Sequence, residues 1–244
     1  MTEIRIVNSG SVLGNGYIIK SGDEILVLEL GCKFQRYIDY LFIEELKDVV
    51  GCIASHFHSD HINPSTAKEF IRRGVDCYAH EEVIKEGHLS DFKPFFSGHR
   101  NEVGQFIVQT FKAPHNVPNY GFLITTPTKE RVLFLTDTTG VNLKFKDIDC
   151  IMVECNHDDK TLLDNLDRQE VSMAHPEFHL GLKDCAKFCK ANLSASTKEI
   201  ILIHLSSMNI NPDYAVKVVR DYTGCPCVSV AHAGHSYKID NDEF

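Results

Sequence analysis

Residues 55–61 read SHFHSDH and place three histidines and one aspartate within seven positions. The preceding run, VVGCIAS (49–55), is typical of a buried strand, so the histidines are expected in the loop at its carboxyl end, where mixed sheets usually carry their sites. Neutral imidazole and carboxylate groups are ligands that suit zinc, manganese or iron. The stretch therefore predicts a metal site in preference to a polar surface loop whose histidines are accidental.

The spacing within HFHSDH favours two ions over one. His56 and His58 can converge on one ion, and Asp60 and His61 can face a second ion after the chain turns. Two ions need more ligands than a single loop supplies. Further histidine or aspartate side chains are therefore expected at the ends of other strands.

Three such residues end apolar, strand-like runs later in the chain. His115 follows QTFKAP, Asp137 follows RVLFLT and His204 follows EIILI. Isolated core or surface residues would have no reason to share this position. Together with the histidine cluster they complete a candidate metal site.

Composition limits the classes of function. The chain has 244 residues, 43% of them hydrophobic, which is enough for a full core in one domain spanning 1–244. The net charge of −9 repels phosphate polymers unless basic residues gather on one face. No apolar run reaches the length of a membrane span, and the first residues lack the pattern of a secretion signal, so a cytoplasmic protein with reduced thiols is expected.

The nine cysteines do not form an obvious metal or redox motif. CAKFC (185–189) and CPC (225–227) lack the C-x-x-C spacing of zinc and redox pairs. We expect them to be mostly small buried residues.

Strand-like and helix-like patterns alternate in two successive rounds, without repeats or linkers. This order predicts an α/β (α+β) fold, a four-layer αβ/βα sandwich of two mixed β-sheets with helices on the outer faces. One helix is expected across 34–49 and another across 64–74, with Pro64 near its start.

Residues 84–104 are the least regular part of the chain and are expected to form a lid or an interface loop. Within them, DFKPFFSGH (91–99) offers aromatic rings that could stack on a nucleobase. An ordinary hydrophobic lid or a dimer contact is the alternative for these rings.

The constellation resembles the metallo-β-lactamase superfamily over nearly the whole chain. HFHSDH matches its H-x-H-x-D-H signature, and the later histidines and aspartate fall in the order of its other metal-binding motifs. The resemblance implies two Zn²⁺ ions, with Mn²⁺ as an alternative. It assigns His56, His58 and His115 to one metal, Asp60, His61 and His204 to the other, and Asp137 to both.

The chain departs from the family pattern at one position. Family members usually carry aspartate after the third strand, where this chain has Glu29 in LVLELG. The groups that support the metal ligands there are expected to be rearranged.

The ligand set resembles that of family members that hydrolyse phosphodiesters. Paired cations suit a phosphate, because a shared water becomes a hydroxide nucleophile and both metals neutralise charge on the non-bridging oxygens. Thioester hydrolases of the superfamily use a similar set, so the ligands alone do not decide the reaction.

A proton donor is suggested by HPEFHLGLKDC (175–185), which resembles segments of the YycJ and ribonuclease Z branches. By that resemblance Glu154 orients His179, and His179 stabilises or protonates the leaving alkoxide. A helix-capping or interface histidine is the alternative for His179. Asn156 and His157 follow in ECNHD as candidates for substrate contact or metal support. The candidate catalytic residues are Asp60, Glu154 and His179.

The remaining histidines are expected to be ordinary hydrogen-bonded side chains, on the surface, in the lid or at a dimer contact. They are His80, His88, His99, His175, His232 and His235.

The compact length, the ECNHD and FHLGL segments and the lack of a basic exosite arm resemble the phage-type anti-Pycsar phosphodiesterases. The resemblance implies a homodimeric enzyme that opens 3′,5′-cyclic mononucleotides in the cytoplasm, that of the host if the chain is phage-encoded. A YycJ-like DNA or RNA nuclease is the second hypothesis, and nucleic acid is a partner only there. Thioester or lactam hydrolysis is a third, and a metal-dependent sensor without turnover is a fourth.

Overall fold

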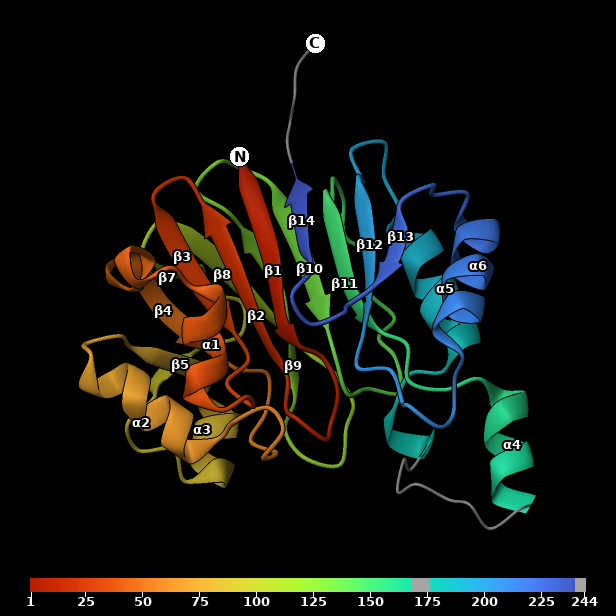
Figure 1. Ribbon diagram of the computed structural model, residues 1–244, viewed down its shortest axis with the longest axis horizontal. Helices are drawn as coiled ribbons and strands as arrows, with labels where there is room; N and C mark the ends of the chain where they lie inside the picture. Colours follow the sequence, from red (N-terminus) through yellow and green to blue (C-terminus); the bar gives the residue numbers. More distant parts are fainter. Residues whose placement is uncertain (168–175, 240–244) are drawn as a thin grey trace.

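The computed structural model describes residues 1–167 and 176–239. They form two mixed β-sheets, each of seven strands, that pack face to face and carry helices on their outer faces (Figure 1). This arrangement confirms the predicted αβ/βα sandwich. His175 lies outside the described residues.

The first sheet has the strand order β14-β1-β2-β3-β4-β5-β6. Strands β14 to β3 are antiparallel to their neighbours, and β3 to β6 run parallel. The strands are β1 (Thr2–Asn8), β2 (Gly16–Ser21), β3 (Glu24–Leu28), β4 (Val49–Ile53), β5 (Cys77–His80), β6 (Lys93–Phe95) and β14 (Ser236–Ile239).

The second sheet repeats this plan with the order β13-β12-β11-β10-β9-β8-β7. Here β10 to β13 run parallel, and β7 to β10 are antiparallel. The strands are β7 (Asn101–Val103), β8 (Phe106–Lys112), β9 (Tyr120–Thr125), β10 (Arg131–Leu135), β11 (Cys150–Glu154), β12 (Glu199–Ile203) and β13 (Val228–Val230).

The helices divide between the two sheets, with α1 to α3 beside the first and α5 and α6 beside the second (Figure 1). Asn63 and Asn211 cap α2 and α6 by accepting backbone N–H bonds, and each is followed by a proline at the first helical position. The α-helices are α1 (Phe34–Tyr40), α2 (Pro64–Arg72), α3 (Glu81–Gly87), α4 (Asp159–Asp167), α5 (Leu182–Asn192) and α6 (Pro212–Thr223). Short 3₁₀ turns span Ile43–Asp48 and Pro176–Phe178.

The alternation of side chains along a strand divides the core into two layers. On β10, Val132 and Phe134 pack between the sheets, whereas Leu133 and Leu135 pack beneath α5 and α6. All four side chains are fully buried, which explains why the sequence of β10 is a continuous apolar run from Val132 to Leu135.

The helix expected across 34–49 is shorter than predicted. It ends at Tyr40, because Leu41 takes an extended conformation and buries its side chain. A 3₁₀ turn follows, in which the carboxylate of Glu45 accepts the backbone N–H of Phe42.

Residues 84–104 contain the end of α3 and two edge strands, β6 of the first sheet and β7 of the second. A lid or interface role for this segment stays a prediction.

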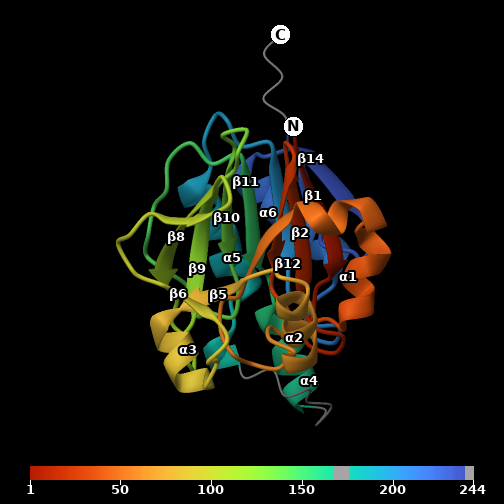
Figure 2. The same cartoon turned by 90° about the vertical axis from the view of Figure 1, so that its left-hand side faces the viewer.

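The parallel strands of both sheets end on the same side of the molecule. That end carries α2, α3 and α4, and it lies opposite the N-terminus and the end of β14 (Figures 1 and 2). At the opposite end a buried hydroxyl cluster joins the sheets: Glu130 Oε2 accepts hydrogen bonds from Thr2 (2.8 Å), Thr126 (2.6 Å) and Thr128 (2.6 Å). No helix within 1–167 or 176–239 is long and apolar enough to cross a membrane.

Candidate metal centre

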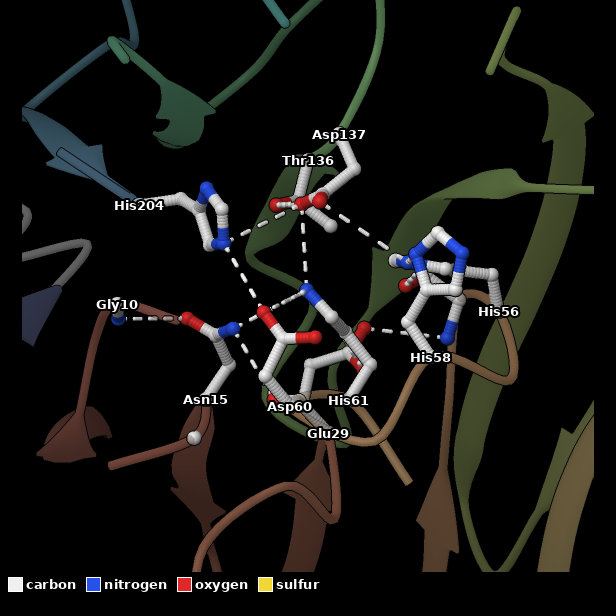
Figure 3. Close-up of polar contacts among 12 residues, drawn as sticks. Gly10, Asn15, Glu29, His56, His58, Asp60, His61, Thr136, Asp137 and His204 are labelled. Carbon is white, nitrogen blue, oxygen red and sulfur yellow. Dashed lines mark hydrogen bonds and ion pairs between the residues drawn. The ribbon is translucent and has the colours of Figure 1, made fainter. Parts of the chain in front are cut away.

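The predicted ligands meet at the carboxyl ends of strands from both sheets. The loop between β4 and α2 carries the HFHSDH cluster, and Asp137 and His204 follow β10 and β12 (Figure 3). His115 follows β8. The structure therefore brings together all seven residues that the sequence assigned to metal, namely His56, His58, Asp60, His61, His115, Asp137 and His204.

The first donor group consists of His56, His58 and His115, whose donor atoms lie within 4.8 Å of one another. Nδ1 of His58 is 3.1 Å from Nε2 of His56 and 3.4 Å from Nε2 of His115. Three imidazoles that turn nitrogen atoms toward one point are a suitable donor set for a divalent transition metal.

The second donor group consists of Asp60, His61 and His204. Oδ2 of Asp60 lies 3.5 Å from Nε2 of His61 and 3.4 Å from Nε2 of His204. This group mixes one carboxylate with two imidazoles, so it also suits a divalent cation.

Asp137 lies between the two groups and turns one oxygen toward each (Figure 3). Oδ1 is 3.2 Å from Nε2 of His61 and 3.7 Å from Nε2 of His204. Oδ2 is 3.9 Å from Nε2 of His56 and 4.0 Å from Nε2 of His115. The carboxylate is therefore placed to contact ions in both groups.

Four of these histidines have Nδ1 held by a neighbouring oxygen. An Nδ1–H that donates to such an oxygen leaves the Nε2 lone pair facing the centre, which fixes the tautomer that a metal requires. The pairs are His56 with Ser55 Oγ (2.9 Å), His61 with Glu29 Oε2 (3.1 Å), His115 with the Phe178 carbonyl (3.1 Å) and His204 with Glu154 Oε1 (3.2 Å). Sequence patterns gave no signal for Ser55 or the Phe178 carbonyl.

Glu29 holds the histidine loop with both of its carboxylate oxygens. Oε1 accepts the backbone N–H of Ser55 at 3.1 Å, while Oε2 pairs with His61. The longer side chain thus reaches the backbone of the histidine loop and one of its ligands at once.

Three residues of the centre have left-handed backbone conformations, at φ angles of 63° for Glu29, 48° for Asp137 and 53° for His204. Such a conformation costs a non-glycine residue roughly 1–2 kcal/mol. Each lies just beyond the end of a strand, so the bend directs the side chain into the centre.

Close backbone packing holds Asp60 in place. A Cβ atom on Gly31 would lie 1.8 Å from the carbonyl oxygen of Asp60, so only glycine fits there. The same carbonyl accepts hydrogen bonds from the backbone N–H (2.7 Å) and side-chain amide (3.1 Å) of Asn15. Asn15 was not anticipated from the sequence.

The electrostatics of the centre favour metal binding. Burial lowers the pKa of His56, His58 and His115, so these imidazoles are neutral donors. Burial would raise the pKa of Asp137, but the charges of His204 and His61 hold it well below its ordinary value. Ionised carboxylate and neutral imidazole are the forms that bind a cation.

Two further histidines respond to these carboxylates. Burial lowers the pKa of His204, but Asp137, Asp60 and Glu154 outweigh it and raise the pKa to about 10. The same balance, with Asp137 and Glu29 as partners, raises the pKa of His61 well above its ordinary value. A cation bound at the second group would therefore displace protons.

Glu154 and His179 form a pair beside the metal ligands. Oε1 of Glu154 lies 2.6 Å from Nδ1 of His179, and Oε2 accepts the backbone N–H groups of Thr138 (3.1 Å) and Leu180 (3.0 Å). Burial lowers the pKa of His179, but the hydrogen bond and charge of Glu154 raise it more, so the net shift is upward. The ring of His179 stacks on that of His204, with centroids 5.4 Å apart.

A cavity of about 610 Å³ opens over the centre. Asn156 lines it and donates to the carbonyl of His204 at 3.2 Å, whereas His157 lines a smaller neighbouring cavity. The rings of residues 91–99 do not line the main cavity. Its lining residues are Ser11, Val12, His58, Asp60, His115, Asn116, Asp137, Asn156, Phe178, His179, His204, Leu205, Ser206, Ser207 and Met208.

The sequence between residues 39 and 205 matches the family model of the beta-lactamase superfamily domain. The chain belongs to this superfamily. Members include metal-dependent hydrolases, and the histidine and aspartate cluster of the chain is able to bind metal. No curated protein matches the sequence.

Solved structures share the superfamily fold at low sequence identity. The metallo-beta-lactamase fold protein YhfI from Bacillus subtilis is 18% identical with a TM-score of 0.72, and the alignment covers 97% of this chain and 98% of that chain. Zn²⁺-bound PqqB from Methylobacterium extorquens is 13% identical with a TM-score of 0.74, covering 97% and 99%. The short form of human tRNase Z is 14% identical with a TM-score of 0.65, covering 98% and 99%.

Proposed function

We propose that the chain is a phosphodiesterase with two metal ions and that it hydrolyses 3′,5′-cyclic mononucleotides. The position of Asp137 carries the proposal, because its two oxygens face two separate donor groups. His179 stands beside both groups, where the leaving oxygen of a substrate would need a proton.

The residues of the two donor groups have distinct roles in this proposal. His56, His58 and His115 would hold one cation, Asp60, His61 and His204 the other, and Asp137 would contact both. Divalent cations bound there would acidify a water molecule and neutralise charge on the phosphate oxygens. Zinc is the first candidate because PqqB is described as Zn²⁺-bound, and manganese is the second.

His179 is suited to the proton transfer. Its Nδ1 is bonded to Glu154, which leaves Nε2 for the leaving oxygen of the substrate. The negative charge of Glu154 favours the protonated imidazole, the form that can donate.

The cavity favours a small substrate. Its volume of about 610 Å³ lies within the roughly 300–1,000 Å³ of small-molecule sites. Val12, Phe178 and Met208 give it an apolar surface for a nucleobase, in place of the predicted ring cluster of residues 91–99. The net charge of −9 disfavours a long phosphate polymer.

A nuclease is the second candidate. It draws support from the likeness in fold to human tRNase Z, whose name refers to transfer RNA. For either activity we propose a homodimer in the cytoplasm, and light scattering that gives the mass of one chain would rule out the dimer.

The deciding experiment supplies the purified protein with zinc or manganese and a panel of substrates. The panel holds 3′,5′-cyclic mononucleotides, single- and double-stranded DNA, a transfer RNA precursor and a thioester, each with a chelator control. Opening of the cyclic nucleotides to linear monophosphates while the polymers survive supports the proposal. Cleavage of polymers alone would replace it with the nuclease.

A further inference from the structure

A second cavity, of about 310 Å³, adjoins the metal centre. It shares Ser11, Val12 and Asp60 with the main cavity, so the tip of the β1–β2 loop lies between the two. Its lining includes two cations, Lys33 and Arg36.

These two cations have no acceptor within the described chain. Arg36 is half-buried, and every other arginine in 1–167 and 176–239 hydrogen-bonds to a carboxylate or a carbonyl. Asp60 is the one carboxylate among the residues that line the second cavity, and it already faces His61 and His204.

The cations on the other side of the centre, in contrast, are paired with carboxylates. Lys183 and Lys187 line the cavity beside His179, but each pairs with a carboxylate at 2.8 Å, Lys183 with Asp159 and Lys187 with Asp184. Of these two cavities beside the centre, the second is therefore the one whose cations are unpaired within the described residues, in a chain whose net charge is −9. Ser59 and Asn63 add polar side chains to its lining.

We propose that the second cavity binds an anionic group of the substrate, a phosphate beyond the one that is cleaved. The inference rests on the proposed phosphodiesterase activity and extends its substrate class. A cyclic mononucleotide would use the metal centre alone. A dinucleotide with a second phosphate would engage Arg36 and Lys33 as well and would be the better substrate.

The kinetic test compares substrates that differ by one phosphate. We expect kcat/KM to be higher for 5′-phosphorylated diadenylate than for diadenylate without that phosphate, and higher for cyclic diadenylate than for cyclic adenylate. Each preference should be roughly ten- to hundred-fold. The variant carrying Lys33→Gln and Arg36→Gln should remove the preference and leave turnover of cyclic adenylate unchanged.

Lys68→Gln is the matched control, since Lys68 is an exposed lysine on α2 that lines neither cavity. It should keep the preference. Equal kcat/KM for the paired substrates in the wild-type chain, or a preference that survives the double substitution, would overturn the inference.

A binding measurement separates this inference from the proposed activity. Calorimetry on the metal-loaded protein should show tighter binding of adenosine 3′,5′-bisphosphate than of adenosine 5′-monophosphate, and the double variant should lose the difference. Absence of turnover on every phosphodiester would refute the proposed function, while the binding difference would still decide the inference. Equal binding of the two nucleotides would count against the second cavity alone.

Discussion

Nδ1 of His179 lies 2.6 Å from Oε1 of Glu154, and the same oxygen lies 3.2 Å from Nδ1 of His204, a residue of the second donor group. One buried carboxylate oxygen therefore orients the proposed proton donor and a candidate metal ligand together. Because Glu154 Oε2 is fixed by two backbone N–H groups, neither histidine can turn without breaking a bond to this carboxylate.

His179→Ala should lower turnover of the best phosphodiester by roughly 10²- to 10⁴-fold, the effect of losing a general acid. Bound metal should stay, because His179 belongs to neither the first donor group nor the second. Steady-state kinetics with elemental analysis would check both. His235→Ala, at an exposed histidine, is the control. Unchanged turnover in His179→Ala would show that another group supplies the proton.

Asp137→Ala should cost roughly half or more of the bound metal, because the carboxylate faces both donor groups. Elemental analysis after dialysis against trace zinc would measure the loss. Asp184→Asn, at an exposed carboxylate on α5, should bind as much metal as the wild type. Full metal content in Asp137→Ala would exclude the bridging role.

Glu29→Asp should weaken metal binding by roughly 10- to 100-fold, the usual effect of losing a group that supports a ligand. The shorter side chain cannot reach both Ser55 N and His61 Nδ1 without moving the backbone. Competition with a chromogenic chelator would measure the affinity. Wild-type affinity in this variant would mean that the aspartate usual in the family serves equally well here.

Gly31→Ala should displace the backbone at Asp60, because the added Cβ would lie 1.8 Å from the Asp60 carbonyl oxygen. We expect a loss of about 1–3 kcal/mol in the free energy of unfolding, together with weaker binding of metal. Urea denaturation with and without chelator would measure both effects. Equal stability of the variant and the wild type would show that the backbone at Asp60 can move away from residue 31 without cost.

Glu45→Gln should destabilise the protein by about 2 kcal/mol at pH 7. Glu45 is buried, and its bonds to Arg5 (2.6 Å) and Lys20 (2.5 Å) outweigh the cost of burial and lower its pKa to about 2. The stabilisation is therefore present above the ordinary pKa of about 4.5 and is lost as pH falls toward 2.

Urea denaturation of this variant and the wild type at pH 7 and pH 3 should show the difference shrinking at the lower pH. Glu69→Gln, at a solvent-exposed ion pair on α2, should have little effect at either pH. A difference in stability that stays constant with pH would contradict the assignment of the stabilisation to the ionised carboxylate of Glu45.

The sequence predicted the features that depend on local pattern. The HFHSDH cluster and the apolar runs that end in His115, Asp137 and His204 located all seven residues of the donor groups. They also located the strands that precede these residues, β4, β8, β10 and β12. Such runs work as signals for β4, β10 and β12, whose side chains are largely buried up to the end of the strand. The sandwich followed from the alternation of strand-like and helix-like patterns in two rounds along the chain.

The features it missed depend on contacts between distant segments. Strands β5, β6, β7 and β14 are short, and pairing with neighbouring strands at or near the sheet edges forms them more than their own patterns do. The helix expected across 34–49 ends early because burial of Leu41 outweighs helical propensity. Asn15 lies 45 residues before Asp60, so no local spacing could link them.

The candidate metal centre straddles the two sheets, since one half of the chain supplies His56, His58, Asp60 and His61 and the other supplies His115, Asp137 and His204. Ions held there would act as a reversible cross-link that closes the long stretch of chain from His56 to His204. The hydroxyl cluster around Glu130 fastens the sheets at the opposite end without metal. Loss of the ions would thus remove the cross-link at the cavity end, and the apolar layer between the sheets and the Glu130 cluster would then be left to hold the two halves together.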